Sequence, residues 1–149
     1  MTRKITHIGV VVHDLGAAIQ QWSENFGFKE IHRADIEVEG LRTAMLSPNG
    51  LPGEMAVELI EPIDKGDLKN AVARHLAKNG EGFYHLAIAT DDIAGSGDAL
   101  EHKAIKVIKL PPAPIGAALQ GIVAEGTGRR VVHPKAASGI LIELLQSCA

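Results

Sequence analysis

The stretch "HIGVVVHDL" (residues 7–15) decides the fold, because a second stretch, "HLAIATDDI" (85–93), repeats its pattern. Each stretch begins with a histidine and continues as an apolar strand. An aspartate that can cap a following helix stands just before its last residue. When the two histidines are aligned, Glu58 in "AVELI" corresponds to Glu143 in "LIELL". The repeat therefore predicts two copies of one unit, each too small to bury its own sheet face alone.

Each unit is expected to contain a strand, a helix and three further strands, in the order βαβββ. Helical spacing of apolar residues predicts a helix between a cap at Asp14 and a stop at Gly27, and a second helix follows a cap at Asp92. A linker helix is expected within "DLKNAVARHLAKNG". The expected strands cover residues 5–12, 29–38, 41–47 and 54–62 in the first unit and 83–90, 105–110, 129–134 and 139–146 in the second.

The predicted fold class is α+β, with two paired βαβββ modules forming a cupped mixed sheet around a metal site. We expect the first module over residues 1–62, a linker helix within 63–80 and the second module over 81–149, all in one structural domain. One segment does not fit the repeat. "PPAPIGAALQGIVAEGTG" (111–128) is rich in glycine, alanine and proline and predicts a long loop that can contain a short helix, either a functional loop or a flexible insertion.

The composition excludes some function classes. The chain has 149 residues and a net charge of −3, and no basic face dominates, which argues against binding to a nucleic-acid backbone. The one cysteine, Cys148, cannot form an intrachain disulfide, so a reducing compartment and a cytoplasmic location are expected. No stretch is expected to act as a signal peptide or to span a membrane.

Four polar residues stand in strands that are otherwise apolar. Glu143 has leucines on its own strand face and aliphatic residues on the other, so burying a lone carboxylate there would cost several kcal/mol. Glu58 is placed in the same way, and His7 and His85 head equally apolar strands. A single strand histidine is more often a hydrogen-bonded core residue, but the matched placement predicts a divalent-metal site. Mixed nitrogen and oxygen ligands suit cobalt, nickel, manganese, zinc or ferrous iron.

Small neighbours of these residues predict a cavity over the metal. Gly9 shares the strand face of His7, and Ala87 and Ala89 share that of His85. Large aliphatic residues occupy the opposite faces, where the helices are expected to pack. The other histidines are not expected to take a direct part in the chemistry, and two of them, His32 and His102, are expected to be exposed. The remaining members of this group are His13, His75 and His133.

The paired units, with histidine and glutamate at these positions, resemble the vicinal-oxygen-chelate (glyoxalase-like) superfamily over nearly the whole chain. "NGEGFYHLAI" (79–88), "DDI" (91–93) and "HPKAASGILIEL" (133–144) are similar to the methylmalonyl-CoA epimerases of that superfamily. The resemblance places the metal ligands at the residues that the burial argument identified: His7, Glu58, His85 and Glu143.

The resemblance also implies a function, that of a metal-dependent epimerase or isomerase acting on an acyl-CoA. The thioester and a neighbouring carboxylate of the substrate would chelate the metal, which would stabilise the enediolate formed when the α-proton leaves. A base on one face removes this proton and an acid on the other face returns one. Glu143 is the candidate for one of these roles, and a homodimer is expected for the fold.

The chain departs from the epimerase pattern where a second carboxylate is expected. After the turn at Gly40, that position holds Thr43, whose hydroxyl is too weak an acid or base near neutral pH. Three possibilities follow. Glu37 or Glu39 reaches the site, a water on the metal replaces the carboxylate, or the protein transfers protons on one face of a related substrate.

Two further differences bear on the substrate. Segment 111–128 is longer than the corresponding turn of the epimerases, and "RRVVHP" (129–134) is shorter than their corresponding stretch. These departures slightly favour the third possibility, proton transfer on one face of a related substrate. Lys135 and either Arg129 or Arg130 are candidates for contacts with CoA phosphates, although such side chains more often lie on a solvated surface.

Other functions of the superfamily stay open at this point. A glyoxalase I-like lyase acting on a thiohemiacetal uses the same kind of ligand set. A non-catalytic small-molecule binding protein is a third alternative, against which four intact ligands count. An extradiol dioxygenase is disfavoured, because a site of two histidines and one carboxylate would not need Glu58.

Overall fold

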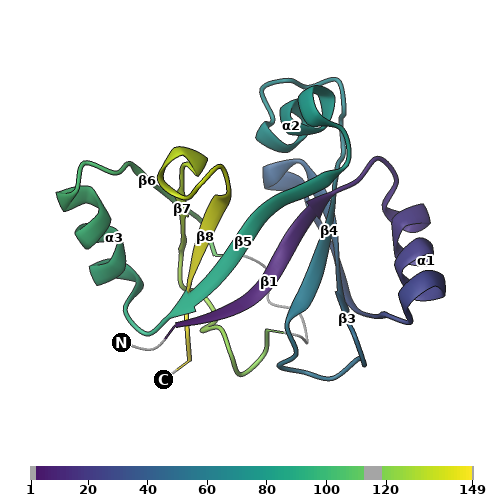
Figure 1. Ribbon diagram of the computed structural model, residues 1–149, viewed down its shortest axis with the longest axis horizontal. Coiled ribbons are helices and arrows are strands. Elements are labelled where there is room, and N and C mark those ends of the chain that lie inside the picture. The colour runs from purple at the N-terminus through teal and green to yellow at the C-terminus, as the bar shows by residue number, and fades with distance from the viewer. Residues whose placement is uncertain (1–2, 113–118, 149) are drawn as a thin grey trace.

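The computed structural model describes residues 3–112 and 119–148, which form an eight-stranded sheet with three α-helices (Figure 1). Two short 3₁₀ helices lie in connections between strands: η1 (Glu37–Glu39) and η2 (Pro134–Ala136). The α-helices are α1 (Leu15–Phe26), α2 (Ala71–Asn79) and α3 (Ile93–His102). The strands are β1 (Arg3–Val11), β2 (Lys29–Ile36), β3 (Leu41–Ser47), β4 (Ala56–Pro62), β5 (Gly82–Thr90), β6 (Val107–Leu110), β7 (Arg129–Val132) and β8 (Leu141–Gln146).

The sheet consists of two halves with the same connectivity, in the order β2-β3-β4-β1-β5-β8-β7-β6. In each half the first and last strands pair in parallel, β1 with β4 and β5 with β8, and the other neighbours are antiparallel. The halves meet where β1 and β5 pair antiparallel. This arrangement confirms the predicted α+β fold of two paired βαβββ units, whereas the division at residues 1–62, 63–80 and 81–149 stays a proposal.

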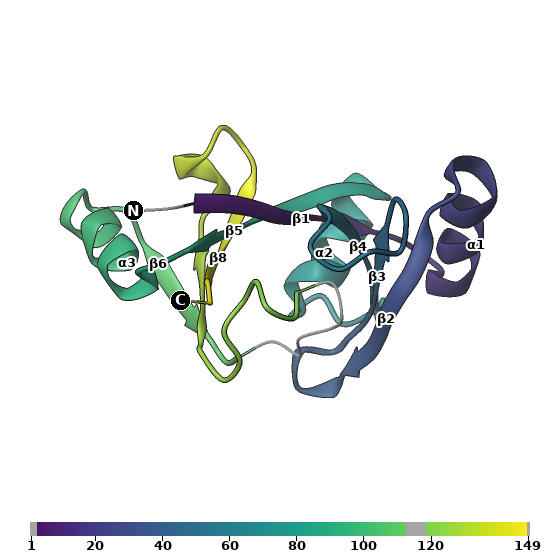
Figure 2. The same cartoon turned by 90° about the horizontal axis from the view of Figure 1, so that it is seen from below.

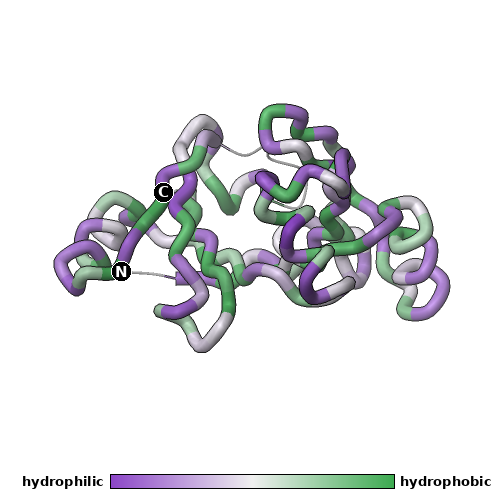
Figure 3. The backbone as a smooth tube through the Cα atoms, turned by 90° about the horizontal axis from the view of Figure 1, so that it is seen from above, coloured by the Kyte–Doolittle hydropathy of each residue, from purple (hydrophilic) through white to green (hydrophobic). Residues whose placement is uncertain are grey.

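The sheet is curved, and its outer face carries two of the helices. Figure 2 shows both halves bending toward the same side, with α1 and α3 at opposite ends of the molecule. Leu15 and Ile19 of α1 pack on Leu59 of β4, and Ile93 of α3 packs on Leu144 of β8. In Figure 3 both helices alternate between hydrophilic and hydrophobic colours, as expected for one face on the sheet and one in solvent. The concave face therefore stays free for a site.

The third helix, α2, closes one end of the concave face. Val72 and Leu76 of this helix are buried against Val11 of β1 and Ile60 of β4. Asn70 caps the helix, because its side chain accepts hydrogen bonds from the backbone N–H groups of residues 72 and 73. The helix consequently begins later than the predicted segment 67–80. Among the residues described, none of the helices has the length and apolarity needed to cross a membrane.

Capping residues explain which element boundaries the sequence predicts well. The side chains of Asp14 and Asp92 accept hydrogen bonds from the N–H groups of Ala17 and Gly95, so α1 and α3 begin where expected. Gly27 ends α1 with a φ of 72°, in the left-handed region that favours glycine.

Five strands are shorter than their predicted ranges. Strand β4 begins at Ala56 and not at 54, and β8 begins at Leu141 and not at 139. Strand β2 ends at Ile36 because η1 follows at once, instead of continuing to residue 38. Strand β6 begins at Val107 and not at 105. Strand β7 stops at Val132 because the next turn leads into η2, whose first residue, Pro134, has no N–H group to continue a ladder.

The predicted loop 111–128 packs against the concave face. Residues 113–118 lie outside the described residues, and the described remainder, 111–112 and 119–128, contains no helix. Leu119 and Val123 are buried in a cluster with Met45 of β3 and Leu145 of β8. The loop thus contacts both halves of the sheet, and in Figure 2 it lies between the two walls.

Candidate metal centre

Four of the residues identified in the sequence meet on the concave face at the junction of the two halves. His7 on β1 and His85 on β5 lie on the two central strands, and Glu58 on β4 and Glu143 on β8 lie on the strands beside them. The register is the same in both halves, because Gly9 stands opposite Glu58 and Ala87 stands opposite Glu143. These small residues do not line the cavity that the sequence predicted them to open, because the His85 ring fills the space over Gly9 and Ala87 is buried in an apolar cluster with Met45 and Leu145.

The donor atoms converge closely. The Nε2 atoms of His7 and His85 are 3.2 Å apart. Oε1 of Glu58 lies 3.7 Å and 3.5 Å from these two nitrogens, and Oε1 of Glu143 lies 3.6 Å and 4.0 Å from them. Donor atoms of His7, His85 and Glu143 all lie within 4.8 Å of one another. Two imidazoles and two carboxylates in this arrangement form a donor set that could hold a divalent metal.

The electrostatics of the four side chains fit a cation. Burial lowers the pKa of His7 to about 4, against the opposing attraction of Glu143, and burial also lowers the pKa of His85. Both imidazoles are therefore neutral near pH 7, which is the form that binds a metal. Burial, followed by repulsion from Glu143, raises the pKa of Glu58 to about 8. A carboxylate in that environment requires a positive partner to stay ionised.

Neighbouring groups fix both histidine rings. Thr6 Oγ1 lies 3.1 Å from Nδ1 of His7, and a proton on Nδ1 leaves Nε2 free to bind a cation. The ring of His85 lies directly over the backbone of Gly9, where an added Cβ would approach the ring atoms to 2.2 Å. The second histidine therefore occupies space that only glycine leaves open on β1.

Arg129 and Glu39 also line the cavity. The sequence offered Glu39, together with Glu37, as a residue that could reach the site, and it named Arg129 only as a candidate phosphate contact. Arg129, at the start of β7, is 7% exposed. Its Nη1 donates to Oε2 of Glu143 at 3.1 Å, its Nη2 donates to Oε1 of Glu39, and its Nε donates to the carbonyl of Pro111 at 2.9 Å. The interpretation of Arg129 as a solvated residue or a phosphate contact is therefore wrong. The alternation of β7 was the available signal, because Arg129 shares its face with Val131, which also lines the cavity.

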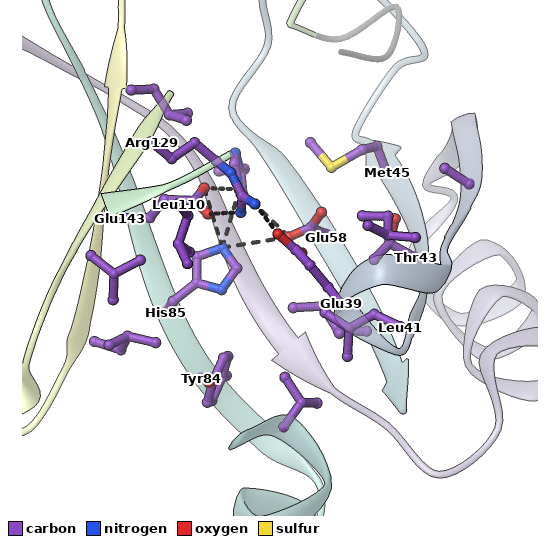
Figure 4. Close-up of a pocket in the computed structure, with 18 of the residues that line it drawn as sticks. Glu39, Leu41, Thr43, Met45, Glu58, Tyr84, His85, Leu110, Arg129 and Glu143 are labelled. Atoms are coloured by element: carbon purple, nitrogen blue, oxygen red, sulfur yellow. Dashed lines mark hydrogen bonds and ion pairs between the residues drawn. The ribbon is translucent and has the colours of Figure 1, made fainter. Parts of the chain in front are cut away.

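A cavity of about 330 Å³ lies over the donors (Figure 4). Its walls are mainly apolar, and Tyr84 closes one side. Thr43 lines the cavity at the position expected for a second carboxylate and is 4% exposed. Of the two glutamates proposed as substitutes, Glu39 lines the cavity and Glu37 is exposed. The apolar wall residues are Ala34, Ile36, Leu41, Met45, Ile60, Ala71, Val72, Ile108, Leu110, Leu119, Val131, Leu141 and Leu145.

One of the remaining histidines is not where the sequence placed it. His32 was expected to be exposed, but it is half-buried on β2 and lines the cavity, because it shares its strand face with Ala34 and Ile36, which also line it. Its Nε2 is buried without a hydrogen-bond partner among the described residues. His102 is exposed, as expected, and His13, His75 and His133 do not line the cavity.

Comparison with known proteins adds a family and several relatives. The model of the "Glyoxalase/Bleomycin resistance protein/Dioxygenase superfamily" matches residues 6–123. A solved methylmalonyl-CoA epimerase in complex with methylmalonyl-CoA and NH4+ is 32% identical, with a TM-score of 0.79 over 100% of this chain and 97% of that one. A Streptomyces coelicolor methylmalonyl-CoA epimerase variant in complex with 2-nitronate-propionyl-CoA is also 32% identical, with a TM-score of 0.77 over 98% of both chains.

Two curated relatives are also similar to this chain, and one of them is named for a different activity. A putative lactoylglutathione lyase from Brassica oleracea var. gemmifera is 27% identical over 146 residues, which cover 97% of this chain and 44% of the relative. Protein MelA from Shewanella colwelliana is 30% identical over 116 residues, or 73% of this chain and 32% of the relative. The chain thus spans less than half the length of either curated relative.

Proposed function

Because this chain belongs to the Glyoxalase/Bleomycin resistance protein/Dioxygenase superfamily, as its vicinal-oxygen-chelate resemblance predicted, we propose that it is a metal-dependent epimerase or isomerase of an acyl-CoA. One observation carries the proposal. Four donor atoms converge beneath a cavity in a chain that is 32% identical, over its whole length, to a methylmalonyl-CoA epimerase. The cytoplasmic location and the homodimer stay predictions.

The proposed cofactor is a divalent metal held by His7, Glu58, His85 and Glu143. Cobalt, nickel, manganese, zinc and ferrous iron all accept such a mixture of nitrogen and oxygen ligands. When bound, the metal supplies Lewis-acid stabilisation of negative charge on the substrate oxygens.

Glu143 is the proposed base for the α-proton. Burial raises the pKa of this carboxyl group, but the two imidazoles and Arg129 outweigh that effect and hold the pKa below its ordinary value. The group is therefore ionised near pH 7 and ready to accept a proton. Arg129 orients the carboxylate through its bond to Oε2, which leaves Oε1 facing the imidazole nitrogens of His7 and His85.

The cavity walls suit the acyl end of a thioester. A volume of about 330 Å³ is too small for a whole CoA, so the nucleotide end would lie outside the cavity. Apolar walls exclude water from the reacting carbon, and this strengthens the electrostatic interactions of the few charged groups present.

A glyoxalase-like lyase is the second candidate function. The observation that favours it is the similarity to the Brassica lactoylglutathione lyase, which spans 97% of this chain. The same donors could polarise a glutathione thiohemiacetal, and Glu143 could act on its α-proton in the same way.

The test measures proton exchange. Purified protein, loaded with each of the five metals in turn, is incubated in D₂O with a panel of acyl-CoAs that includes methylmalonyl-CoA, and with the methylglyoxal–glutathione thiohemiacetal in parallel. We expect deuterium at the α-carbon of an acyl-CoA, and loss of that exchange in Glu143→Gln. Turnover of the thiohemiacetal without acyl-CoA exchange would favour the lyase, and binding without either reaction would favour a binding protein.

Metal analysis tests the ligands independently of activity. His85→Ala should lower the metal content of the purified protein, whereas His102→Ala, on the exposed end of α3, should leave it unchanged. His32 is not a suitable control, because it lines the cavity. Full metal occupancy in His85→Ala would contradict the ligand assignment.

A further inference from the structure

Two carboxylates from opposite halves of the sheet are held by one guanidinium at the cavity. Glu143 comes from β8 in the second half, and Glu39 comes from η1, beside β3 in the first half. Arg129 donates to Glu143 from Nη1 and to Glu39 from Nη2. Figure 4 shows the Glu39 side chain reaching toward Arg129 and Glu58. Its exposure of 21% is consistent with a group at the edge of the cavity.

The local backbone directs Glu39 inward. Its carbonyl accepts a hydrogen bond of 2.8 Å from the side chain of Asn70, which also caps α2. The next residue, Gly40, has a φ of 67°, a left-handed conformation that lets the chain turn into β3. The preceding residues of η1, Glu37 and Val38, remain exposed. Glu39 is therefore fixed at both its main chain and its carboxylate.

The proposed reaction needs a second proton carrier. Epimerisation inverts the α-carbon, so the proton that leaves one face must be replaced from the other. Thr43 lines the cavity but has only a weakly acidic hydroxyl. We propose that Glu39 is the proton carrier on the face of the α-carbon opposite Glu143, an inference that rests on the proposed epimerase function.

The proton transfers balance in both directions. Glu143 takes the α-proton, and the electron pair of the broken C–H bond moves into the enediolate. Protonated Glu39 then gives its proton to the opposite face of the same carbon, where a new C–H bond forms. The other enantiomer reacts with the two roles exchanged, and proton exchange with solvent resets both carboxyl groups.

Arg129 acts as a positioning residue for this pair. A proton carrier works within hydrogen-bond reach of the carbon, so carriers on opposite faces stand roughly 6 Å apart. A guanidinium that donates to a different carboxylate from each Nη atom holds the two groups apart by its own width plus two hydrogen bonds, about the same distance.

The test follows each face of the substrate separately. Wild-type protein, Glu39→Gln and Glu37→Gln are incubated in D₂O with the two enantiomers of methylmalonyl-CoA in separate reactions. Glutamine at residue 39 keeps the acceptor for Arg129 but cannot carry a proton. In this variant we expect one enantiomer to exchange its α-proton with retained configuration, the other to be inert, and interconversion to fall by about 100-fold or more.

The controls separate this role from a structural one. Glu37→Gln changes an exposed carboxyl group of the same 3₁₀ helix and should match the wild type in exchange and inversion. Metal content, methylmalonyl-CoA affinity and thermal unfolding should be unchanged in Glu39→Gln. Glu39→Asp keeps a carboxyl group and should recover part of the inversion that Glu39→Gln loses.

Each other result has a distinct meaning. Inversion at the wild-type rate in Glu39→Gln overturns the inference, as does loss of exchange for both enantiomers in a folded, metal-loaded variant. Loss of inversion in His32→Gln with full inversion in Glu39→Gln would assign the role to His32. Wild-type protein that exchanges one enantiomer without inverting it has no second carrier and also overturns the inference. Wild-type protein that exchanges no acyl-CoA proton overturns the proposed function itself.

Discussion

Glu58 and Glu143 occupy matching positions but differ in their partners. Glu143 accepts a hydrogen bond from Arg129, whereas the contacts of Glu58 among the described residues are with the imidazole nitrogens of His7 and His85. Burial raises the pKa of Glu58 to about 8, and the negative charge of Glu143 adds to this effect. Without a metal, Glu58 is therefore one of the residues that link the stability of the protein to pH, and its raised pKa lowers that stability as the pH rises.

The first prediction concerns Glu58→Gln in the metal-free protein. A glutamate with an unfolded pKa near 4.5 and a folded pKa of about 8 stabilises the fold fully below pH 4.5, and this contribution is lost as the pH rises toward 8. Glutamine stays neutral, so the variant should keep this contribution at high pH. Its free energy of unfolding at pH 8.5 should exceed that of the wild type by a few kcal/mol. Urea unfolding with a chelator, at pH 5.5 and 8.5, measures the difference.

The matched control for this experiment is Glu37→Gln, which removes an exposed carboxyl group. Its unfolding free energy should follow the wild-type pH profile. If the wild type and Glu58→Gln lose stability in parallel between pH 5.5 and 8.5, the charge on Glu58 does not cause the loss.

At this scale the sequence predicts the donors better than their surroundings. A charged or titratable residue in an apolar strand is detectable from alternation alone, and this identified His7 and Glu143. The burial of Arg129, and the choice of Glu39 over Glu37, were not predictable because these two side chains meet across 90 positions of chain. Glu39 also lies in a 3₁₀ turn and not in a strand, so no alternating pattern indicates its direction.

Among the elements, the described part of the segment after β6 is anchored to the sheet beside the cavity. Leu119 lines the cavity and is 7% exposed, and the backbone around it is tied to the end of β8. Ala124 donates to the carbonyl of Gln146, and Cys148 donates to that of Ile122. Residues 119–124 therefore form a part of the cavity wall that is anchored to the end of the sheet.

The second prediction is that Leu119→Ala changes the preferred acyl group. Removing the buried side chain enlarges the cavity and should destabilise the protein by about 2–5 kcal/mol. The ratio of kcat/KM for ethylmalonyl-CoA to that for methylmalonyl-CoA should rise about tenfold, because one methylene is worth at least that much in an apolar pocket. Steady-state kinetics on both substrates gives the ratio.

Ile122→Ala is the comparison variant, because Ile122 packs in the same apolar cluster without lining the cavity. It should lower stability and leave the substrate ratio unchanged. An equal change of ratio in both variants would mean that loosening of the segment, and not the size of residue 119, controls the preference.

Element boundaries were predictable where a single residue determines them. Asp14, Gly27 and Asp92 act through local hydrogen bonds or backbone conformation, which the sequence shows directly. The packing of segment 119–128 was not predictable. Its apolar residues have no helical or strand period, and their partners, Met45 and Leu145, lie on different halves of the sheet.

Across the whole molecule, the proposed metal ligands are divided equally between the two halves. His7 and Glu58 belong to the first half of the sheet, and His85 and Glu143 belong to the second. The halves join through the β1–β5 pairing, which runs through both histidines. A metal bound by all four residues would therefore hold this junction together.

The third prediction follows from this division. Metal at 100 times its dissociation constant should add about 2.7 kcal/mol to the free energy of unfolding. For a chain of this size, that corresponds to a rise in Tm of roughly 5–10 °C. A chelator should reverse the rise, and differential scanning calorimetry across metal concentrations measures it.

His85→Ala should lose most of this rise, and His102→Ala should keep it. A Tm that does not change with metal in the wild-type protein would contradict the proposed cofactor. A full rise in His85→Ala would place the metal elsewhere.

Gly9 has a consequence for recognising other chains with this chemistry. Since the His85 ring fills the space where a Cβ of residue 9 would be, a sequence can keep all four donors and still be unable to hold its second histidine in place. The diagnostic pattern therefore has a fifth position, two residues after the first histidine, that is defined by the lack of a side chain. A database search that scores only the donors would accept chains that this geometry excludes.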